Sequence, residues 1–206
     1  MQPEIAKKLL ELNHQFYQNF AEDFSATRQR LQPGVSQVLD AVPLAASVLD
    51  LGCGNGQLAS YLFDHGHTGA YLGIDTAQNL VEIAQQQELP NTKFIQADLT
   101  ASGWETELPA QSYEYIFCFA VMHHIPGEQL RIEFLQKVRR LLTPGGRFIH
   151  SNWQFLESEK LRERVLPWET VGLTQDDVDP QDYLLDWRRG GTGYRYVHYY
   201  TNKELN

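Results

Sequence analysis

The sequence is poor in cysteine and has no long apolar run. Of its 206 residues only Cys53 and Cys118 are cysteines, the first in a glycine-rich segment and the second in an apolar one. A pair placed in this way is not the disulfide framework of a small secreted protein, and it indicates free thiols in a reducing compartment. No stretch approaches the roughly 20 apolar residues of a membrane span, and residues 1–5 lack the basic and then apolar order of a signal peptide. We therefore expect a cytoplasmic protein with no membrane partner.

The sequence also lacks an excess of basic residues. It has 17 Lys and Arg against 26 Asp and Glu, a formal net charge of -9. Proteins that bind nucleic acid without help usually carry a basic surface, because contacts to phosphate provide most of the affinity. The composition therefore disfavours unaided binding of nucleic acid, and leaves open a local basic patch or a second subunit.

No pattern of metal ligands is present. His123 and His124 are adjacent, so their side chains point in different directions, and no Cys or Glu stands at ligand spacing. The acidic residues Asp177 and Asp179 do not begin a calcium loop, because glycine is missing at the sixth position and Arg188 stands at the twelfth. We predict no metal.

What the sequence does contain is a glycine-rich segment directly after an apolar strand. Residues 48–56 read Val-Leu-Asp-Leu-Gly-Cys-Gly-Asn-Gly. Glycine has no Cβ, so it allows a positive φ and lets a ligand approach the backbone closely. A strand that enters such a loop, with helix-forming residues after it, is typical of a nucleotide-type site at the carboxyl end of a parallel strand.

Apolar periodicity predicts strands alternating with helices. We expect strands over 47–51, 70–74, 93–97, 115–121 and from 147, with helices over 4–31, 34–42, 57–66, 77–88 and 130–141, and with Thr76 as the N-cap of the fourth helix. This alternation predicts an α/β fold with a doubly wound, mostly parallel sheet. We expect a single domain over 1–206, made of N-terminal helices (1–45), a cofactor-binding core (46–155) and an insertion with a substrate-side tail (156–206).

Two cofactors fit the glycine segment by itself. Residues 54–59 satisfy the dinucleotide pattern G-x-G-x-x-A, and Asp75 lies 19 residues beyond Gly56, as an NAD site requires. Asp50, however, stands where a pyrophosphate dianion would need backbone N–H groups, and it suits a ligand with an amino group and a sulfonium. Asp98 follows the third strand and offers an acceptor for an adenine amino group.

Together these segments resemble the class I S-adenosylmethionine-dependent methyltransferases, a Rossmann-like family. The matching segments are 49–56, Asp75, 97–99 and 142–148. The resemblance implies a sheet with strand order 3-2-1-4-5 and S-adenosyl-L-methionine as the cofactor. The cofactor-binding residues that it implies are Asp50, Gly52, Cys53, Gly54, Asn55, Gly56, Asp75, Thr76, Asp98, Leu99 and Phe119.

Outside this core the chain resembles the tRNA wobble-uridine carboxymethyl methyltransferases. The similar segments are 17–28, 120–124, 167–168, 194–199 and 204–205. That family esterifies a carboxylate on a modified uridine of tRNA. The resemblance implies a tRNA acceptor, a small activator subunit, and Arg28, His124, Arg195 and His198 as the residues that serve the acceptor.

Three other functions stay open. The acidic composition favours a small carboxylate or hydroxyl metabolite as the methyl acceptor; a non-catalytic binding module and an NAD oxidoreductase are the alternatives. The final strand pair of the family is expected to be missing or incomplete. Thr201 and Glu204 have capping-box spacing, which predicts the start of a helix close to the last residue. We therefore expect the native chain to continue beyond Asn206.

Overall fold

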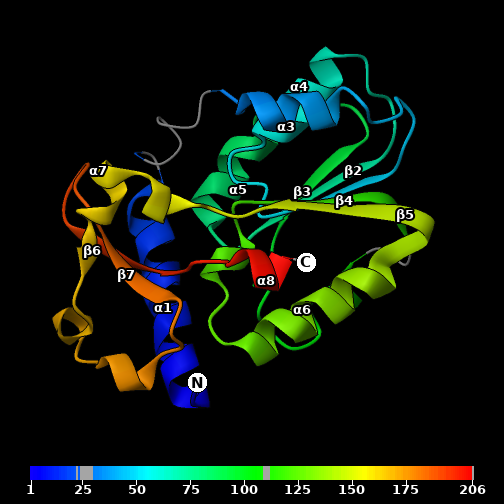
Figure 1. The fold of residues 1–206 in the computed structure, drawn as a ribbon. Coiled ribbons are helices and arrows are strands. Elements are labelled where there is room, and N and C mark those ends of the chain that lie inside the picture. The colour runs from blue at the N-terminus through cyan, green and yellow to red at the C-terminus, as the bar shows by residue number, and fades with distance from the viewer. Residues whose placement is uncertain (22, 24–29, 109–111, 206) are drawn as a thin grey trace. The chain divides into compact units, whose positions relative to one another are not determined.

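The computed structural model describes residues 1–21, 23, 30–108 and 112–205 (Figure 1). Contacts group the chain into two compact units, neither of them continuous in sequence. The five-strand unit comprises Ala21–Phe119 and Phe134–His150, and the hairpin unit comprises Met1–Phe20, Ala120–Glu133 and Ser151–Asn206. The expectation of one domain in three consecutive parts stays a prediction. Among the described residues, no helix combines the length and the apolar character that crossing a membrane requires.

The five-strand unit is built on a parallel sheet with the order β3-β2-β1-β4-β5. Its strands are β1 (Val48–Leu51), β2 (Tyr71–Asp75), β3 (Thr92–Gln96), β4 (Tyr113–Phe119) and β5 (Leu142–Ser151). β1 pairs with β2 and β4, and all four of its residues are buried. Burial on both faces is typical of a central parallel strand and fits Val48, Leu49 and Leu51, whereas Asp50 is a buried acid. The predicted doubly wound fold and strand order are confirmed.

Helices cover both faces of this sheet (Figure 1). They are α3 (Pro33–Leu39), α4 (Gln57–Asp64), α5 (Gln78–Gln85), the 3-10 turn η1 (Trp104–Glu107) and the part of α6 (Glu128–Leu141) that belongs to this unit. Buried residues of α3, α4 and α5 pack in one apolar cluster with Val48, Tyr71 and Phe117 of the sheet. Phe134 of α6 stacks on Trp104, with ring centroids 6.4 Å apart.

Several predicted boundaries were wrong. The helix after β2 has Ala77 and not Thr76 as its N-cap, and no side chain caps it. The N–H of Ala77 instead donates to the side chain of Asp75, in the turn before the helix. β5 begins at Leu142, five residues earlier than predicted, directly after α6. The first helix, α1 (Pro3–Asn19), ends before the predicted limit of 31, and several residues of the remainder lie outside the described part.

The hairpin unit contains a second, antiparallel sheet of order β6-β7-β8. Its strands are β6 (Val165–Leu166), β7 (Asp182–Trp187) and β8 (Gly193–His198). The short helical segments are η2 (Met122–His124), η3 (Phe155–Glu157), α7 (Glu159–Arg162), η4 (Trp168–Val171), η5 (Gln175–Asp177) and α8 (Asn202–Leu205). Leu184 of β7 and Tyr196 of β8 pack against Leu9 of α1, so the amphipathic N-terminal helix buries its apolar face here.

The tail has the predicted local structure. Residues 194–198 are extended in β8, and Glu204 Oε2 accepts both the N–H and the hydroxyl of Thr201, at 2.9 and 2.8 Å. Among the described residues no strand follows β5 in the five-strand sheet, since β7 and β8 pair with each other.

Candidate cofactor and acceptor sites

Three glycines shape the loop between β1 and α4. Gly52, Gly54 and Gly56 have φ values of 82°, 54° and 81°, a backbone region in which other residues are strained. At Gly56 a Cβ would also lie 2.8 Å from Nε2 of Gln87 and 3.0 Å from Cβ of Ala84. The alternation of glycines predicted from the sequence therefore has a steric cause. The N–H groups of Gly52 and Cys53 both donate to the carbonyl of Ile74, so the loop is held against β2 at the carboxyl end of β1.

Asp75 connects the end of β2 to this loop. Its Oδ2 accepts the N–H of Gly54 at 2.8 Å, and its Oδ1 accepts the N–H of Ala77 at 2.9 Å. Burial raises the pKa of Asp75, and these backbone donors oppose the rise. The carboxylate is thus held against the glycine loop, where lone pairs remain for the hydroxyl groups of a ligand.

Asp50 is a second buried carboxylate, with 3% of its surface exposed. Its Oδ2 accepts the hydroxyl of Tyr71 at 2.6 Å. Burial raises the pKa of Asp50 to about 7, with a further rise from the charge of Asp75, although the Tyr71 hydrogen bond lowers it. Near neutral pH this carboxyl group is therefore poised between its two protonation states.

The remaining cofactor candidates surround these two acids. Cys53 is buried, and burial raises the pKa of its thiol well above the usual value, so it is a neutral packing residue. Phe119 ends β4 and stacks on Phe117 at 5.4 Å. The carbonyl of Asn55 accepts Nε2 of Gln87.

The next strand end carries the adenine candidates. Asp98 is exposed, and its Oδ1 accepts the N–H and hydroxyl of Thr100 at 2.8 and 2.6 Å. Leu99 is buried with 7% exposure, and the carbonyl of Thr76 accepts Nε2 of Gln96 at 3.2 Å. Asp98 thus stabilises the turn after β3 and presents its carboxylate to solvent.

Gln87 was not predicted as a site residue. Its Nε2 donates to the carbonyl of Asn55 at 2.6 Å, and its Oε1 accepts the hydroxyl of Ser60 at 2.5 Å. It therefore ties the glycine loop to α4 from a position just after α5. Glutamine is common on exposed helix ends, so nothing in its sequence position distinguishes it from its neighbour Gln86.

In the hairpin unit, His124 is held at both ring nitrogens. Nδ1 lies 3.0 Å from the carbonyl of Tyr196, which can only accept, so Nδ1 carries a proton. Nε2 lies 2.7 Å from the hydroxyl of Tyr17. Asn13 completes the arrangement, because its amide bonds the N–H and carbonyl of Tyr196 and the carbonyl of His124. Neither Tyr17 nor Asn13 was predicted to contact His124.

Arg195 lies in an aromatic cage and is 4% exposed. Its guanidinium carbon is 4.6 Å from the ring centroid of Trp153, 5.2 Å from that of Phe16 and 5.5 Å from that of Trp187. Cation–π contacts of this kind favour a buried arginine and fix the plane of its donors. The cage therefore holds a positive charge in a low-dielectric setting.

His198 is enclosed by carboxylates. Its Nδ1 lies 2.7 Å from Oδ1 of Asp182 and its Nε2 lies 3.0 Å from Oε1 of Glu204. The hydroxyl of Tyr196 also donates to Asp182. Both ring nitrogens thus connect β7, β8 and α8, which indicates a structural role. Arg28, the fourth residue predicted for the acceptor, lies outside the described residues.

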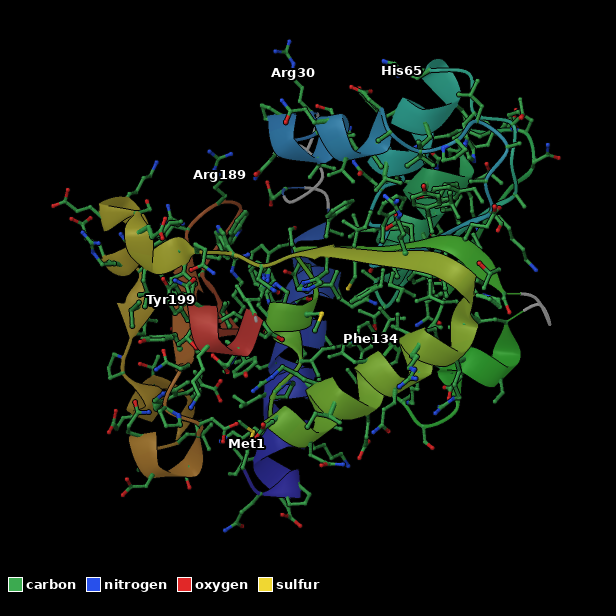
Figure 2. All side chains as sticks on the ribbon, turned by 45° about the vertical axis from the view of Figure 1, so that its right-hand side comes forward. Met1, Arg30, His65, Phe134, Arg189 and Tyr199 are labelled. Carbon is green, nitrogen blue, oxygen red and sulfur yellow. The ribbon has the colours of Figure 1, made fainter. Side chains whose placement is uncertain are left out.

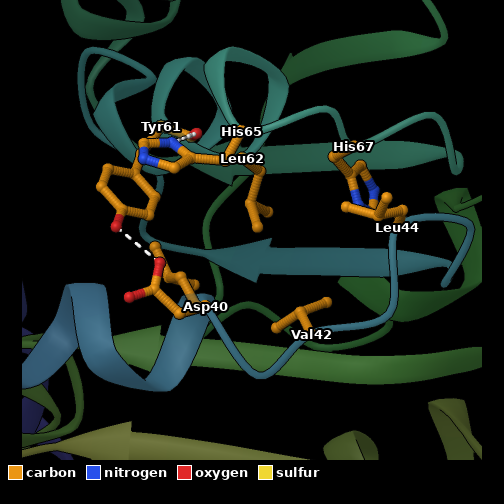
Figure 3. A pocket seen from close by; sticks show the side chains of 8 residues that line it. Asp40, Val42, Leu44, Tyr61, Leu62, His65 and His67 are labelled. Atoms are coloured by element: carbon orange, nitrogen blue, oxygen red, sulfur yellow. Dashed lines mark hydrogen bonds between the residues drawn. The ribbon is translucent and has the colours of Figure 1, made fainter.

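A separate pocket of about 210 Å³ lies in the five-strand unit, away from the glycine loop (Figure 3). It is lined by Leu39, Asp40, Val42, Leu44, Tyr61, Leu62, His65 and His67. The Tyr61 hydroxyl donates to Asp40 at 2.6 Å, and the ring of His65 stacks on Tyr61. None of the cofactor candidates lines it. Across the described residues, no three His, Cys, Asp or Glu side chains gather as a metal site would require.

Residues 48–146 match the family model described as a methyltransferase domain. Together with the strand order and the glycine loop after β1, this match assigns residues 48–146 to a methyltransferase domain with the class I fold. Within that class the chain resembles the tRNA carboxymethyluridine methyltransferases, as predicted from the sequence.

Two curated relatives carry this resemblance. The chain is 32% identical over 180 residues to the tRNA (carboxymethyluridine(34)-5-O)-methyltransferase ALKBH8 of Mus musculus, a match that covers 85% of this chain but 25% of the mouse protein. It is 29% identical over 178 residues to the tRNA (carboxymethyluridine(34)-5-O)-methyltransferase of Schizosaccharomyces pombe, covering 86% of this chain and 68% of that protein. The chain thus spans about a quarter of the mouse relative and about two thirds of the yeast one.

Solved structures support the fold. A DhpI–SAM–HEP complex aligns with a TM-score of 0.68 and 21% identity, over 96% of this chain and 85% of that chain. A complex between the Haloferax volcanii Trm112 methyltransferase activator and a methyltransferase aligns with a TM-score of 0.57 and 20% identity, over 71% and 64%. At these identities the likeness extends to the fold alone.

Replacement of Gln87 by alanine should loosen the glycine loop. It removes the donor to Asn55 and the acceptor of Ser60, which together contribute about 1–2 kcal/mol. We expect a lower free energy of unfolding in urea and an affinity for S-adenosylmethionine reduced roughly fivefold by calorimetry. Gln86→Ala, at the exposed neighbour, is the matched control; equal effects of the two variants would contradict this role for Gln87.

Asp50 should make the stability of the ligand-free protein depend on pH. Its pKa is raised from 3.8 to about 7, so the folded state binds the proton more tightly, and the stability from the protonated form is lost as pH rises from about 4 through 7. Asp50→Asn does not titrate. Relative to the wild type, the free energy of unfolding of the variant should therefore rise by roughly 2–3 kcal/mol between pH 5 and pH 8, because about two pH units of this interval lie below the raised pKa.

Urea unfolding of both proteins at the two pH values measures this difference. The contributions of the titrating groups that the two proteins share cancel when the variant is compared with the wild type. A gap between wild type and variant that is the same at pH 5 and pH 8 would show that Asp50 does not titrate in this range.

Proposed function

We propose that the chain is an S-adenosylmethionine-dependent methyltransferase whose acceptor is a carboxylate on a modified wobble uridine of tRNA. The observation that carries the proposal is the pair of buried carboxylates, Asp50 and Asp75, beside the glycine loop at the carboxyl ends of adjacent parallel strands. Ligands of open α/β sheets bind at this edge.

The charge of the pair favours a cationic cofactor. A pyrophosphate dianion would face two carboxylates there, whereas an ammonium and a sulfonium would be attracted by them. When bound, S-adenosylmethionine supplies an activated methyl group. In this proposal Asp75 bonds the ribose hydroxyls, Asp98 or Leu99 contacts adenine, and the loop from Gly52 to Gly56 receives the methionine part.

The hairpin unit offers groups that suit a carboxylate acceptor. An ionised carboxylate carries no proton that must be removed, so it needs cationic and hydrogen-bonding groups more than a base. Arg195 is a buried cation with a fixed plane. The ring of His124, held by Tyr17 and Tyr196, is suited to positioning. Both are proposed to orient the acceptor.

A tRNA acceptor requires positive charge on a chain that is acidic overall. The turn between β7 and β8 carries Arg188 and Arg189, both exposed, and Figure 2 shows Arg189 extending away from the ribbon. Arg188 pairs with Asp186, and Arg162 adds a further exposed cation on α7. Such a patch can contact phosphate. A small activator subunit that adds basic surface stays a prediction.

The proposal is tested by incubating the protein with methyl-labelled S-adenosylmethionine and either total tRNA or a nucleic-acid-free metabolite extract. We expect label that is released by nuclease and, because the product is a methyl ester, lost on mild alkaline treatment. Asp75→Asn is the inactive control. Alkali-stable label would reject a carboxylate acceptor, and label in the extract alone would support the small-molecule alternative.

The arginine turn provides a second test of the tRNA acceptor. Arg188→Glu with Arg189→Glu should lower kcat/KM for tRNA at least roughly tenfold at low salt and flatten its salt dependence, because phosphate contacts are lost. Binding of S-adenosylmethionine should not change. Lys7→Glu with Arg139→Glu makes the same change in net charge at other exposed positions and is the control.

The test rejects the arginine turn as a tRNA contact if both double variants lose activity equally. If calorimetry shows that the protein binds S-adenosylmethionine but no label reaches either acceptor pool, the result supports a non-catalytic binding module.

A further inference from the structure

We infer that Tyr71 is a positioning residue for the methyl-donor site, where its hydroxyl holds Asp50 oriented and ionised beside the glycine loop. The inference rests on the proposed function for the identity of the ligand. The contact that carries it is the 2.6 Å hydrogen bond from the Tyr71 hydroxyl to Oδ2 of Asp50, between two side chains that are 2% and 3% exposed.

Strand register brings these side chains together. Val48 pairs with Tyr71 and Asp50 pairs with Gly73, so Asp50 and Tyr71 share one face of the sheet as diagonal neighbours. Gly73 separates Tyr71 from Asp75 on that face. A Cβ there would lie 2.6 Å from Phe94 and 3.0 Å from Cβ of Cys53, so the missing side chain makes room for this packing.

The two acids of the site are stabilised by different groups. Asp75 accepts backbone N–H groups of Gly54 and Ala77, which no side-chain substitution removes. Among the described residues, the side chain that donates to Asp50 is that of Tyr71. The charge of Asp50 therefore depends on one hydroxyl group.

Tyr71 is also a dependable donor. Burial raises its pKa well above 10, and the charge of Asp50 raises it further. The proton therefore stays on the tyrosine whenever Asp50 is ionised. A donor that favours the ionised form lowers the pKa of its acceptor, so loss of this hydroxyl should leave Asp50 protonated to a higher pH.

This has a consequence for a cationic ligand. A protonated Asp50 gives no electrostatic attraction, and a cation that binds beside it must first expel the proton. In the wild type, affinity for S-adenosylmethionine should fall below about pH 7, where Asp50 takes up its proton. In Tyr71→Phe the same fall should begin at a higher pH.

The experiment is calorimetry of S-adenosylmethionine binding from pH 6 to pH 9, in buffers of different ionisation enthalpy. For Tyr71→Phe we expect affinity roughly tenfold below wild type at pH 7.5, recovery towards wild type at pH 9, and more protons released per ligand bound at pH 8. Tyr61→Phe is the matched control. It removes a hydrogen bond of the same 2.6 Å length, to Asp40, outside the glycine loop.

An equal loss of affinity at every pH, with unchanged proton release, would show that Tyr71 only packs, and would overturn the inference. Unchanged affinity at every pH would overturn it as well. If the wild type binds no S-adenosylmethionine, the proposed function fails. Carbon-13 NMR of the Asp50 carboxyl group then decides about Tyr71 separately, because its titration should move upward in Tyr71→Phe and not in Tyr61→Phe.

Discussion

The constraint on which the five-strand unit depends is the burial of two carboxylates next to each other. Asp50 and Asp75 sit on adjacent parallel strands in a region with little solvent, and burial raises the pKa of both. Such groups are costly unless they are hydrogen-bonded or paired with a ligand. The backbone N–H groups of Gly54 and Ala77 compensate Asp75, and a tyrosine hydroxyl compensates Asp50. A cationic ligand would offset the part of this burial cost that the hydrogen bonds leave. The ligand-free domain is therefore less stable than it would be without the two acids.

This arrangement explains why the surroundings of the loop are so closely packed. The loop can reach Asp75 only with left-handed backbone at alternate positions, and Gly56 leaves no space between the loop and the end of α5. Gln87 then fixes the loop from outside by bonding Asn55 and Ser60. Held on both sides, the N–H groups and the two acids have a defined geometry before a ligand arrives, which reduces the cost of ordering them on binding.

Much of this unit could be predicted from the sequence, because its signals are local. The strand before the glycines, the acids at strand ends and the glycine alternation each follow from backbone geometry, and the strand order came with the family resemblance. Gln87 and Tyr71 could not be predicted, since their partners lie 32 and 21 residues away. Thr76 was predicted as a helix cap because a hydroxyl residue often caps a helix that follows a strand. In the structure the helix begins one residue later, with Ala77 as its N-cap and no capping side chain.

In the hairpin unit, residue type alone does not predict what a side chain does. His124, Arg195 and His198 were grouped by a resemblance, yet their environments differ. His198 lies between two carboxylates and joins strands to α8, whereas Arg195 has aromatic faces around its guanidinium. Stacking on aromatic rings fixes the plane of a guanidinium, and a planar cation of this kind suits a planar anion such as a carboxylate. Both ring nitrogens of His198 already face carboxylates of the protein, so this ring is not placed to bind the carboxylate of an acceptor. If the acceptor is a carboxylate, the arginine is therefore the better candidate for its recognition, and His198 holds the tail in place.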